Sequence, residues 1–145
     1  MKVHLEQVKS KEEEEAIIKA VSVTDEITGA IELLEGGSKG IAVIKDDQVH
    51  IIKASAVYYI ESVDKKTFVY TKDVCYDCKY RLYELETMLG GYFMRCSKSM
   101  IINLRKVRNV KSQLSGRIDA TLINDETVVI SRGYVKEVKR RLGIG

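Results

Sequence analysis

The chain has 145 residues, of which 45% are hydrophobic and 31% charged, a balance typical of one soluble domain or of one domain with a small appendage. No apolar run approaches the roughly 20 residues that a membrane-spanning helix needs, and the N-terminus lacks the apolar core of a signal peptide. We therefore expect a cytoplasmic protein. Its three cysteines are expected to be free thiols, because they cannot all pair and no export signal is seen.

The net charge of +3 hides an asymmetry along the chain. Residues 1–50 carry six Lys and Arg against eleven Asp and Glu, a net of −5, whereas residues 51–145 carry eighteen against ten, a net of +8. Such a split predicts a basic part that binds a polyanion, joined to an acidic part with another task. Positive charge alone explains attraction to nucleic acid but no choice of sequence.

The first 39 residues are predicted to form a small acidic extension containing two strands and one helix. Residues 2–8 place apolar side chains alternately, and residues 16–21 form a short β-branched run, so both segments favour strands. The acidic run at residues 12–15 between them is expected to be solvated.

Thr24 is a predicted helix N-cap, because Ile27, Ile31 and Leu34 follow it at helical spacing. Gly36 and Gly37 are expected to end this helix. We place a boundary here, with the extension at residues 1–39 and the main domain at residues 40–145.

From residue 40 the pattern changes to short strands with polar turns. Two hairpins are expected, one with Asp46 and Asp47 in its turn and one with a basic turn at residues 63–66. The predicted elements are strands at residues 41–45, 48–53, 57–62, 67–71, 74–78, 107–112, 117–123 and 127–130, and helices at residues 80–89 and 131–142. The predicted fold class is mainly β with short helices (α+β), beside a small N-terminal strand–strand–helix unit.

Residues 93–103, FMRCSKSMIIN, combine a basic, hydroxyl-rich centre with apolar flanks. A buried strand would not hold Arg95 and Lys98 without partners, because an unpaired buried charge is too costly. One interpretation is a segment, pinned by its flanks, that presents a lysine and two hydroxyls to an anionic partner. The other is a solvated turn between two core segments.

Catalytic and metal-binding patterns are weak in this sequence. Cys75 and Cys78 form a CxxC motif, but both lie in a predicted strand, where residues three apart point to opposite faces, so we expect packing roles. His4 and His50 lie in no triad or zinc-binding pattern. We predict no enzymatic activity, no metal and no cofactor.

Ser131 and Arg132 precede and open the last predicted helix. Ser131 is suited to capping it, the free N–H groups of a helix start favour phosphate, and the Arg132 fork suits phosphate or guanine. A simpler account is a cap beside a surface arginine. Four cations all lie in segments that interrupt regular structure: Lys65, Lys66, Lys98 and Arg132. This shared location predicts that they form one positive face.

Four runs of this sequence are similar to the LytTR-type DNA-binding domain of bacterial transcription regulators. They are IESVDKKTFVYT, KYRLYELETML, FMRCSKSMIINLRKV and LINDETVVISRGYVKEVKRRL, and the likeness covers roughly residues 45–143. The most specific features are F-x-R-x-x-x-S-x-x-x-N, at Phe93, Arg95, Ser99 and Asn103, and Ser-Arg-x-Tyr, which begins at Ser131. The resemblance implies an elongated, mostly antiparallel β arrangement of packed sheets with short helices.

The resemblance also implies that loops, rather than a recognition helix, contact the DNA. The residues it points to are Lys65, Lys66, Thr67, Arg95, Ser97, Lys98, Arg132 and Lys136. Family members often carry His or another base-contacting residue where Thr67 stands, and His or Arg where Ser97 stands. At these two positions this chain departs from the family pattern. The departure leaves open which bases are recognised, but it does not affect the expected contacts with the DNA backbone.

Together these features predict a sequence-specific DNA-binding transcriptional regulator. The resemblance implies double-stranded DNA with direct repeats as the target, bound by a homodimer, and a short class without a receiver domain. The acidic extension is expected to mediate self-association or to hold a regulatory partner, such as a membrane protein. The alternatives are a protein-interaction module whose basic face binds an acidic partner, and an RNA-binding β domain that stacks bases on exposed aromatic side chains.

Overall fold

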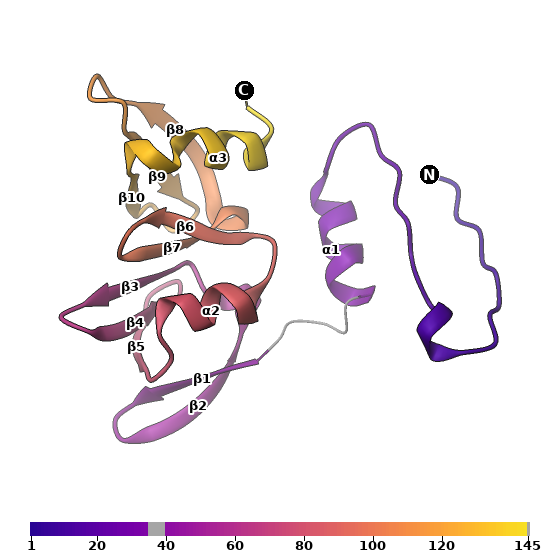
Figure 1. Cartoon of the computed structure of the whole chain (residues 1–145), viewed down its shortest axis with the longest axis horizontal. Helices are drawn as coiled ribbons and strands as arrows, with labels where there is room; N and C mark the ends of the chain where they lie inside the picture. Colours follow the sequence, from indigo (N-terminus) through magenta and orange to yellow (C-terminus); the bar gives the residue numbers. More distant parts are fainter. Residues whose placement is uncertain (35–39, 145) are drawn as a thin grey trace. The chain divides into compact units, whose positions relative to one another are not determined.

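The computed structural model describes residues 1–34 and 40–144 of the chain (Figure 1). The chain divides into two compact units, Met1–Ser38 and Lys39–Gly145. The domain boundary at residues 39 and 40 stays a prediction, because the connecting residues 35–39 lie outside the described part. The helix end expected at Gly36 and Gly37 lies there too.

The first unit contains a 3-10 turn, η1 (Lys11–Glu13), and one helix, α1 (Asp25–Leu34). Thr24 caps α1 as predicted: its hydroxyl oxygen accepts a hydrogen bond from the Ile27 amide at 3.3 Å, and its carbonyl accepts one from the Thr28 amide. Asp25 and Glu26 occupy the first turn, where carboxylates interact favourably with the helix dipole.

The predicted strands at residues 2–8 and 16–21 are wrong. Both segments run as irregular chain outside any sheet, and their apolar side chains lie in solvent, with Leu5 92% and Ile17 72% exposed. A strand needs a neighbouring backbone to hydrogen-bond with. β-branched composition alone does not supply that neighbour, and the sequence pattern gave no information about one.

The second unit is built from two antiparallel sheets, which confirms the predicted fold class. The strands of the larger sheet lie in the order β2-β1-β5-β4-β3-β7-β6, and those of the smaller sheet in the order β10-β9-β8. The strands are β1 (Gly40–Lys45), β2 (Gln48–Lys53), β3 (Tyr59–Val63), β4 (Lys66–Tyr70), β5 (Cys75–Cys78), β6 (Phe93–Ser97), β7 (Met100–Asn103), β8 (Val107–Ser112), β9 (Ile118–Leu122) and β10 (Thr127–Ile130). The helices are α2 (Leu82–Leu89) and α3 (Arg132–Leu142), and short 3-10 turns lie at η2 (Ala54–Ala56) and η3 (Leu104–Lys106).

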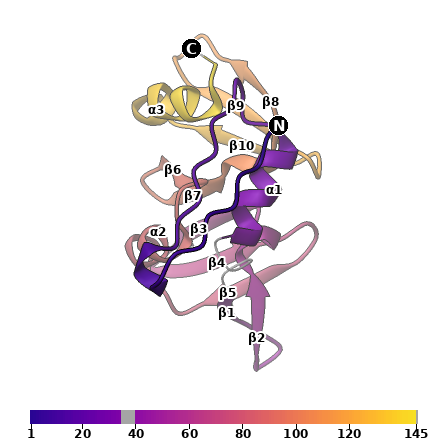
Figure 2. The same ribbon diagram turned by 90° about the vertical axis from the view of Figure 1, so that its right-hand side faces the viewer.

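This unit is elongated. Two views at right angles place the small sheet with α3 at one end, the β6–β7 hairpin in the middle and the β1–β2 hairpin at the other end (Figures 1 and 2). The predicted helices and most predicted strands lie within a few residues of the observed ones.

Two hairpin turns have the tight left-handed geometry that joins antiparallel strands. Asp46 and Asp47 have φ of 53° and 61°, and Asp64 and Lys65 have φ of 50° and 66°. Paired left-handed residues match the twist of a two-residue hairpin. The second turn is shorter than the predicted residues 63–66, because Val63 and Lys66 pair with each other as the last rung of the β3–β4 ladder.

Strand β7 separates two hydrophobic clusters. Ile101 belongs to the cluster beneath α2, and Ile102 to the cluster shared by the small sheet and α3; both side chains are fully buried. Adjacent residues of a strand point to opposite faces, so one strand serves both cores. Burying each such side chain stabilises the fold by roughly 1.5–3 kcal/mol.

Asn103 ends β7 and is one of the buried polar residues of this unit, at 1% exposed. Its side-chain amide donates to the Val57 carbonyl at 2.8 Å, and its side-chain oxygen accepts from the Arg105 amide at 3.0 Å. These bonds satisfy two backbone groups at the point where the chain leaves the large sheet. Asn103 thus holds the end of the segment at residues 93–103 in place.

Replacing Asn103 by Ala should lower the free energy of unfolding by about 1–3 kcal/mol, because it leaves buried backbone groups without partners. Urea denaturation of wild type and variant measures the difference. Asn109→Ala, at an exposed position of β8, is the matched control and should change stability little. Equal unfolding midpoints for N103A and wild type would contradict this role.

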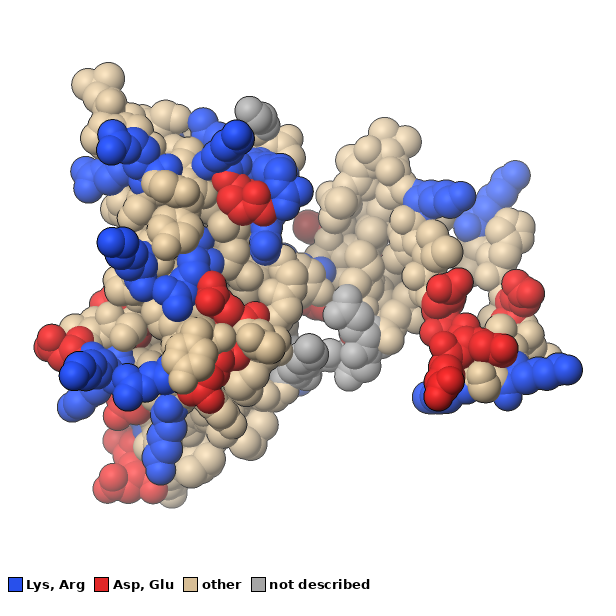
Figure 3. All heavy atoms as spheres, in the orientation of Figure 1, with Lys and Arg blue, Asp and Glu red and all other residues tan. Residues whose placement is uncertain are grey.

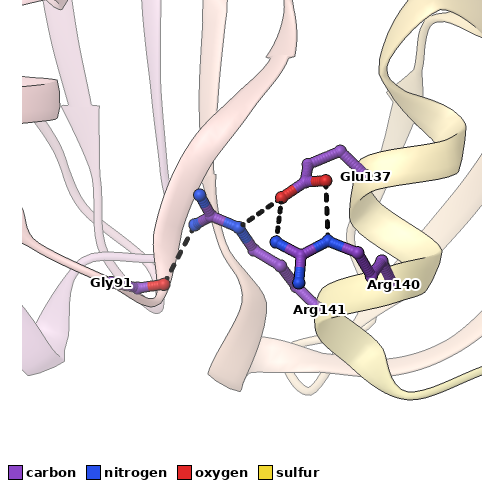
Figure 4. Close-up of polar contacts among 4 residues, drawn as sticks. All are labelled: Gly91, Glu137, Arg140 and Arg141. Carbon is purple, nitrogen blue, oxygen red and sulfur yellow. Dashed lines mark hydrogen bonds and ion pairs between the residues drawn. The ribbon is translucent and has the colours of Figure 1, made fainter.

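The C-terminal half of α3 is anchored by a carboxylate and two arginines (Figure 4). Glu137 accepts hydrogen bonds from Arg140 Nε at 2.9 Å and from Arg141 Nε at 3.2 Å. Arg141 also donates from Nη1 to the Gly91 carbonyl at 3.0 Å. Glu137 therefore orients the arginine that joins α3 to the segment between α2 and β6.

We expect Glu137 to stay ionised at unusually low pH. The hydrogen bonds from Arg140 and Arg141 lower the pKa of Glu137 from 4.5 to about 2. Because the folded pKa lies below the ordinary value, the stabilisation is complete above about pH 4.5 and is lost as the pH falls through about 2.

An NMR titration of the Glu137 carboxyl carbon tests this expectation, with Arg141→Gln predicted to move the midpoint upward. A wild-type midpoint near the ordinary value would show that the contacts in Figure 4 are not formed in solution.

Candidate nucleic-acid interface

The basic segment at residues 93–103 is a hairpin, and Lys98 and Ser99 form its turn between β6 and β7. The Ser97 hydroxyl oxygen accepts a hydrogen bond from the Ser99 amide at 3.2 Å. Arg95 Nη1 donates to the Lys98 carbonyl at 2.6 Å. The turn is solvent-exposed, as both interpretations expect, and its backbone is held by the Ser97 and Arg95 side chains, as suits the interpretation of a pinned segment.

The β3–β4 turn lies beside the β6–β7 turn. Strand β3 pairs with β7, and one further backbone bond, from the Ser62 amide to the Ser99 carbonyl at 2.8 Å, continues this contact up to the turns. Arg81, immediately before α2, donates from Nη1 to the Lys65 carbonyl at 3.2 Å. Lys65 and Lys66 therefore project from the same end of the sheet as Lys98.

The start of α3 is joined to the same region. The Ser131 amide donates to the Cys96 carbonyl at 2.8 Å, which places Arg132 next to the end of β6. The predicted side-chain cap is not formed: Ser131 stands at the N-cap position but makes no side-chain cap hydrogen bond, and its carbonyl instead accepts from the Tyr134 amide.

Lys and Arg side chains gather along the edge that carries these turns and the start of α3 (left side of Figure 3). Lys65, Lys66, Lys98, Arg132 and Lys136 are all exposed. Within residues 1–34 and 40–144, none of the five forms an ion pair. This edge of the domain therefore presents five cations that no ion pair neutralises in the described residues.

The other three predicted site residues are buried or half-buried. Thr67 is 5% exposed and lies in β4 between Ser62 of β3 and Cys78 of β5, so its side chain does not reach the surface. Arg95 already has two partners. Its Nη1 donates to the Lys98 carbonyl, and its Nε lies 3.2 Å from Glu86 Oε1. The contact with Glu86 is an ion pair without a hydrogen bond. Ser97 is half-buried, and its oxygen supports the turn.

Arg81 was missed by the sequence interpretation, which placed it inside a helix without a role. Its contact with the Lys65 carbonyl joins residues that are distant in sequence. Spacing along α2 carries no information about that contact.

The aromatic side chains of the large sheet are not arranged as base-stacking platforms. Tyr58 is buried, and the rings of Tyr59 and Tyr70 stack on each other with centroids 4.3 Å apart. Burial, followed by a hydrogen bond with Glu126, raises the pKa of Tyr59. These contacts argue against the RNA-binding alternative, which needs free ring faces.

Two of the three cysteines occupy packing positions. Cys75 is exposed and Cys78 is buried, as expected for opposite faces of a strand, and Cys96 is fully buried. Burial raises the pKa of Cys96 to about 12, which disfavours the reactive thiolate. In the described part of the chain, His, Cys, Asp and Glu side chains form no group of three or more suited to a metal.

Gly116, in the turn between β8 and β9, controls the space available to Arg132. Its φ is +87°, and a Cβ added there would lie 2.7 Å from Cδ of Arg132. Gly133, the residue after Arg132, has open space around the position of a Cβ. These two glycines therefore form a matched pair.

Gly116→Ala should cost about 1–3 kcal/mol of stability through backbone strain and should displace the Arg132 side chain. Gly133→Ala should be neutral or stabilising, because Ala is the better helix former. Chemical denaturation and the Arg132 side-chain NMR resonances measure both effects. Unchanged Arg132 resonances in G116A would contradict the contact.

None of the described helices is long and apolar enough to cross a membrane. The family model of the LytTr DNA-binding domain matches residues 47–143. A solved structure, the LytTr DNA-binding domain of a methyl-accepting/DNA response regulator from Bacillus cereus, superimposes with a TM-score of 0.69 at 28% identity, covering 74% of this chain and 99% of that one.

Two relatives are HTH-type transcriptional regulators from Staphylococcus aureus. The one from strain MSSA476 is 31% identical over 140 residues, covering 94% of this chain and 95% of the relative. The one from strain NCTC 8325 is 34% identical over 99 residues, covering 68% and 67%. With a family match over most of its length and a solved domain of the same fold, this chain belongs to the LytTr DNA-binding domain family.

Proposed function

We propose that this protein is a sequence-specific transcriptional regulator that binds duplex DNA through the β3–β4 turn, the β6–β7 turn and the start of α3. The observation that carries the proposal is that backbone hydrogen bonds bring these three segments together along one side of the domain. There they expose five cations without carboxylate partners among the described residues. Duplex DNA is the polyanion that the family implies.

The five cations have different chemistry and therefore different roles. Lys65, Lys66 and Lys98 are point charges that neutralise backbone phosphates and set the register of the protein on DNA. Arg132 carries a planar fork that matches the O6 and N7 atoms of guanine in the major groove. Lys136 lies one helical turn beyond Arg132, on the same side of α3, and is suited to an adjacent phosphate.

Turns rather than a recognition helix make these contacts in the proposal. Five strands separate α2 from α3, so these two helices do not form the closely joined pair that a helix-turn-helix requires. Thr67 is left out of the contact surface because it is buried, and Arg95 and Ser97 are assigned to support of the β6–β7 turn.

We further propose that two copies bind direct repeats, as the resemblance implies. The acidic first unit exposes several large apolar side chains, including Val3, Leu5 and Val21. Exposed apolar side chains on a segment without a core of its own suit self-association or the binding of a regulatory partner, such as a membrane protein.

Arg132→Ala should remove about 1–3 kcal/mol of discrimination between cognate and unrelated DNA while leaving the fold intact, because its side chain is exposed. Selection from random duplexes supplies the cognate motif, and binding titrations of both proteins on that motif and on an unrelated duplex measure the discrimination. Lys72→Ala, beyond the opposite end of β4, is the control and should keep it. Equal discrimination by R132A and wild type would remove Arg132 from base recognition.

The same selection separates a regulator from the alternative of a protein-interaction module with a basic face. An enriched, repeated motif supports the regulator, whereas recovery of unenriched DNA supports the module. Affinity should also fall steeply with salt, as counterions are released from neutralised phosphates. A flat salt response would contradict phosphate contact.

A further inference from the structure

A shallow, open hollow lies between the β6–β7 turn and the start of α2. Its polar lining is Ser62, Arg81, Tyr83, Arg95, Lys98 and Ser99. Three of these side chains are cationic and three carry hydroxyl groups, so the hollow is lined by hydrogen-bond donors and positive charge. Such a lining favours an anion with several acceptor oxygens.

The nearby carboxylates leave two of the three cations uncompensated. Glu86 pairs with Arg95, and Glu84 accepts a hydrogen bond from the backbone amide of Arg81 at 3.1 Å. In the described part of the chain, Arg81 and Lys98 form no ion pair with a carboxylate. The positive charge of the hollow therefore comes from these two side chains.

The guanidinium of Arg81 is positioned before any ligand arrives. One of its nitrogens, Nη1, donates to the Lys65 carbonyl at 3.2 Å, which fixes the plane of the fork. A guanidinium has five N–H donors, so this bond leaves donors available to an anion. Because the anchoring carbonyl belongs to the β3–β4 turn, the hollow and that turn keep a constant spacing.

The location favours one phosphate of a polymer over a free anion. The hollow opens beside Lys98 and next to the turn that carries Lys65 and Lys66, all of which the proposed function assigns to phosphates. A diester held in the hollow has neighbouring phosphates to meet those lysines. A free anion does not use the adjacent turns.

We propose that Arg81 and Lys98, with the hydroxyls of Ser62 and Ser99, bind one backbone phosphate of duplex DNA. The start of α2 is then a fourth contact segment, beside the two turns and the start of α3 already described. This inference rests on the proposed function, since it names the ligand of the same face.

Arg81→Gln and Arg81→Lys test the inference, with Lys72→Gln as control. The slope of log affinity against log salt, measured on a short duplex of unrelated sequence, should decrease in magnitude by about 0.9 for R81Q, the value for one lost phosphate contact. R81K keeps the charge and should keep the wild-type slope, as should K72Q. On the selected motif, R81Q should lower specific and non-specific affinity by the same factor, because phosphate contacts carry no sequence information.

Neutralising the phosphates of the selected duplex one at a time, as methylphosphonates, provides a second measurement that needs no folded variant. One position should weaken wild-type binding and have no further effect on R81Q. Absence of such a position, an unchanged slope for R81Q, or an equal loss of slope for R81K and R81Q would overturn the inference, the last by showing that Arg81 only supports the turn. If wild type itself binds duplex without salt dependence, the proposed function fails instead.

Discussion

The hydrogen bond from the Ser62 amide to the Ser99 carbonyl is the contact on which the proposed interface depends. It joins two turns that lie far apart in the sequence, and it does so through backbone atoms, so side-chain substitution at the turns leaves it in place. Arg81 and Arg95 add side-chain support, each donating to the carbonyl of a lysine that stands in a turn. Cationic tips with fixed spacing match the regular spacing of phosphates along a duplex. Cations on independent loops would have to be ordered at the moment of binding, at a cost in entropy.

The distribution of ion pairs supports the same division between structure and function. Three arginines elsewhere in the second unit have carboxylate partners: Arg108 pairs with Asp125, and Arg140 and Arg141 pair with Glu137. Arg117 instead donates to the Ser115 hydroxyl. Exposed pairs of this kind contribute little to stability, roughly 0–1 kcal/mol each. Their effect is to remove positive charge from places where DNA is not proposed to bind. At the end of the sheet that carries the turns, Lys65, Lys66 and Lys98 keep their charge, and mutual repulsion there is relieved only by counterions or by a polyanion.

Local signals in the sequence predicted most of the second unit, and tertiary contacts account for the failures. The Asp46–Asp47 turn could be placed because aspartate tolerates the left-handed backbone that tight turns need, which both residues adopt with φ of 53° and 61°. Whether residues 2–8 and 16–21 form strands could not be determined from the sequence alone, because a strand forms only beside a partner strand. Thr67 follows a basic turn and stands at a position where family members often carry a base-contacting residue. Its burial, however, depends on the alternation of inward and outward side chains along β4 as this strand pairs with its neighbours. The contact of Arg81 with the Lys65 carbonyl could not be predicted from the local sequence around Arg81.

Base recognition depends on which side chains of the turns are free to contact DNA bases. With Thr67 buried and the Arg95 fork engaged, the turns offer mainly lysines, which neutralise phosphates without discriminating between bases. In the proposed function, discrimination then rests on Arg132, whose aliphatic stem lies against Gly116 in the β8–β9 turn. The small sheet, which carries none of the lysine turns, would therefore set the direction of the fork that the proposal assigns to guanine. A change of residue at position 116 is expected to alter sequence preference while phosphate contact, and hence non-specific affinity, stays the same.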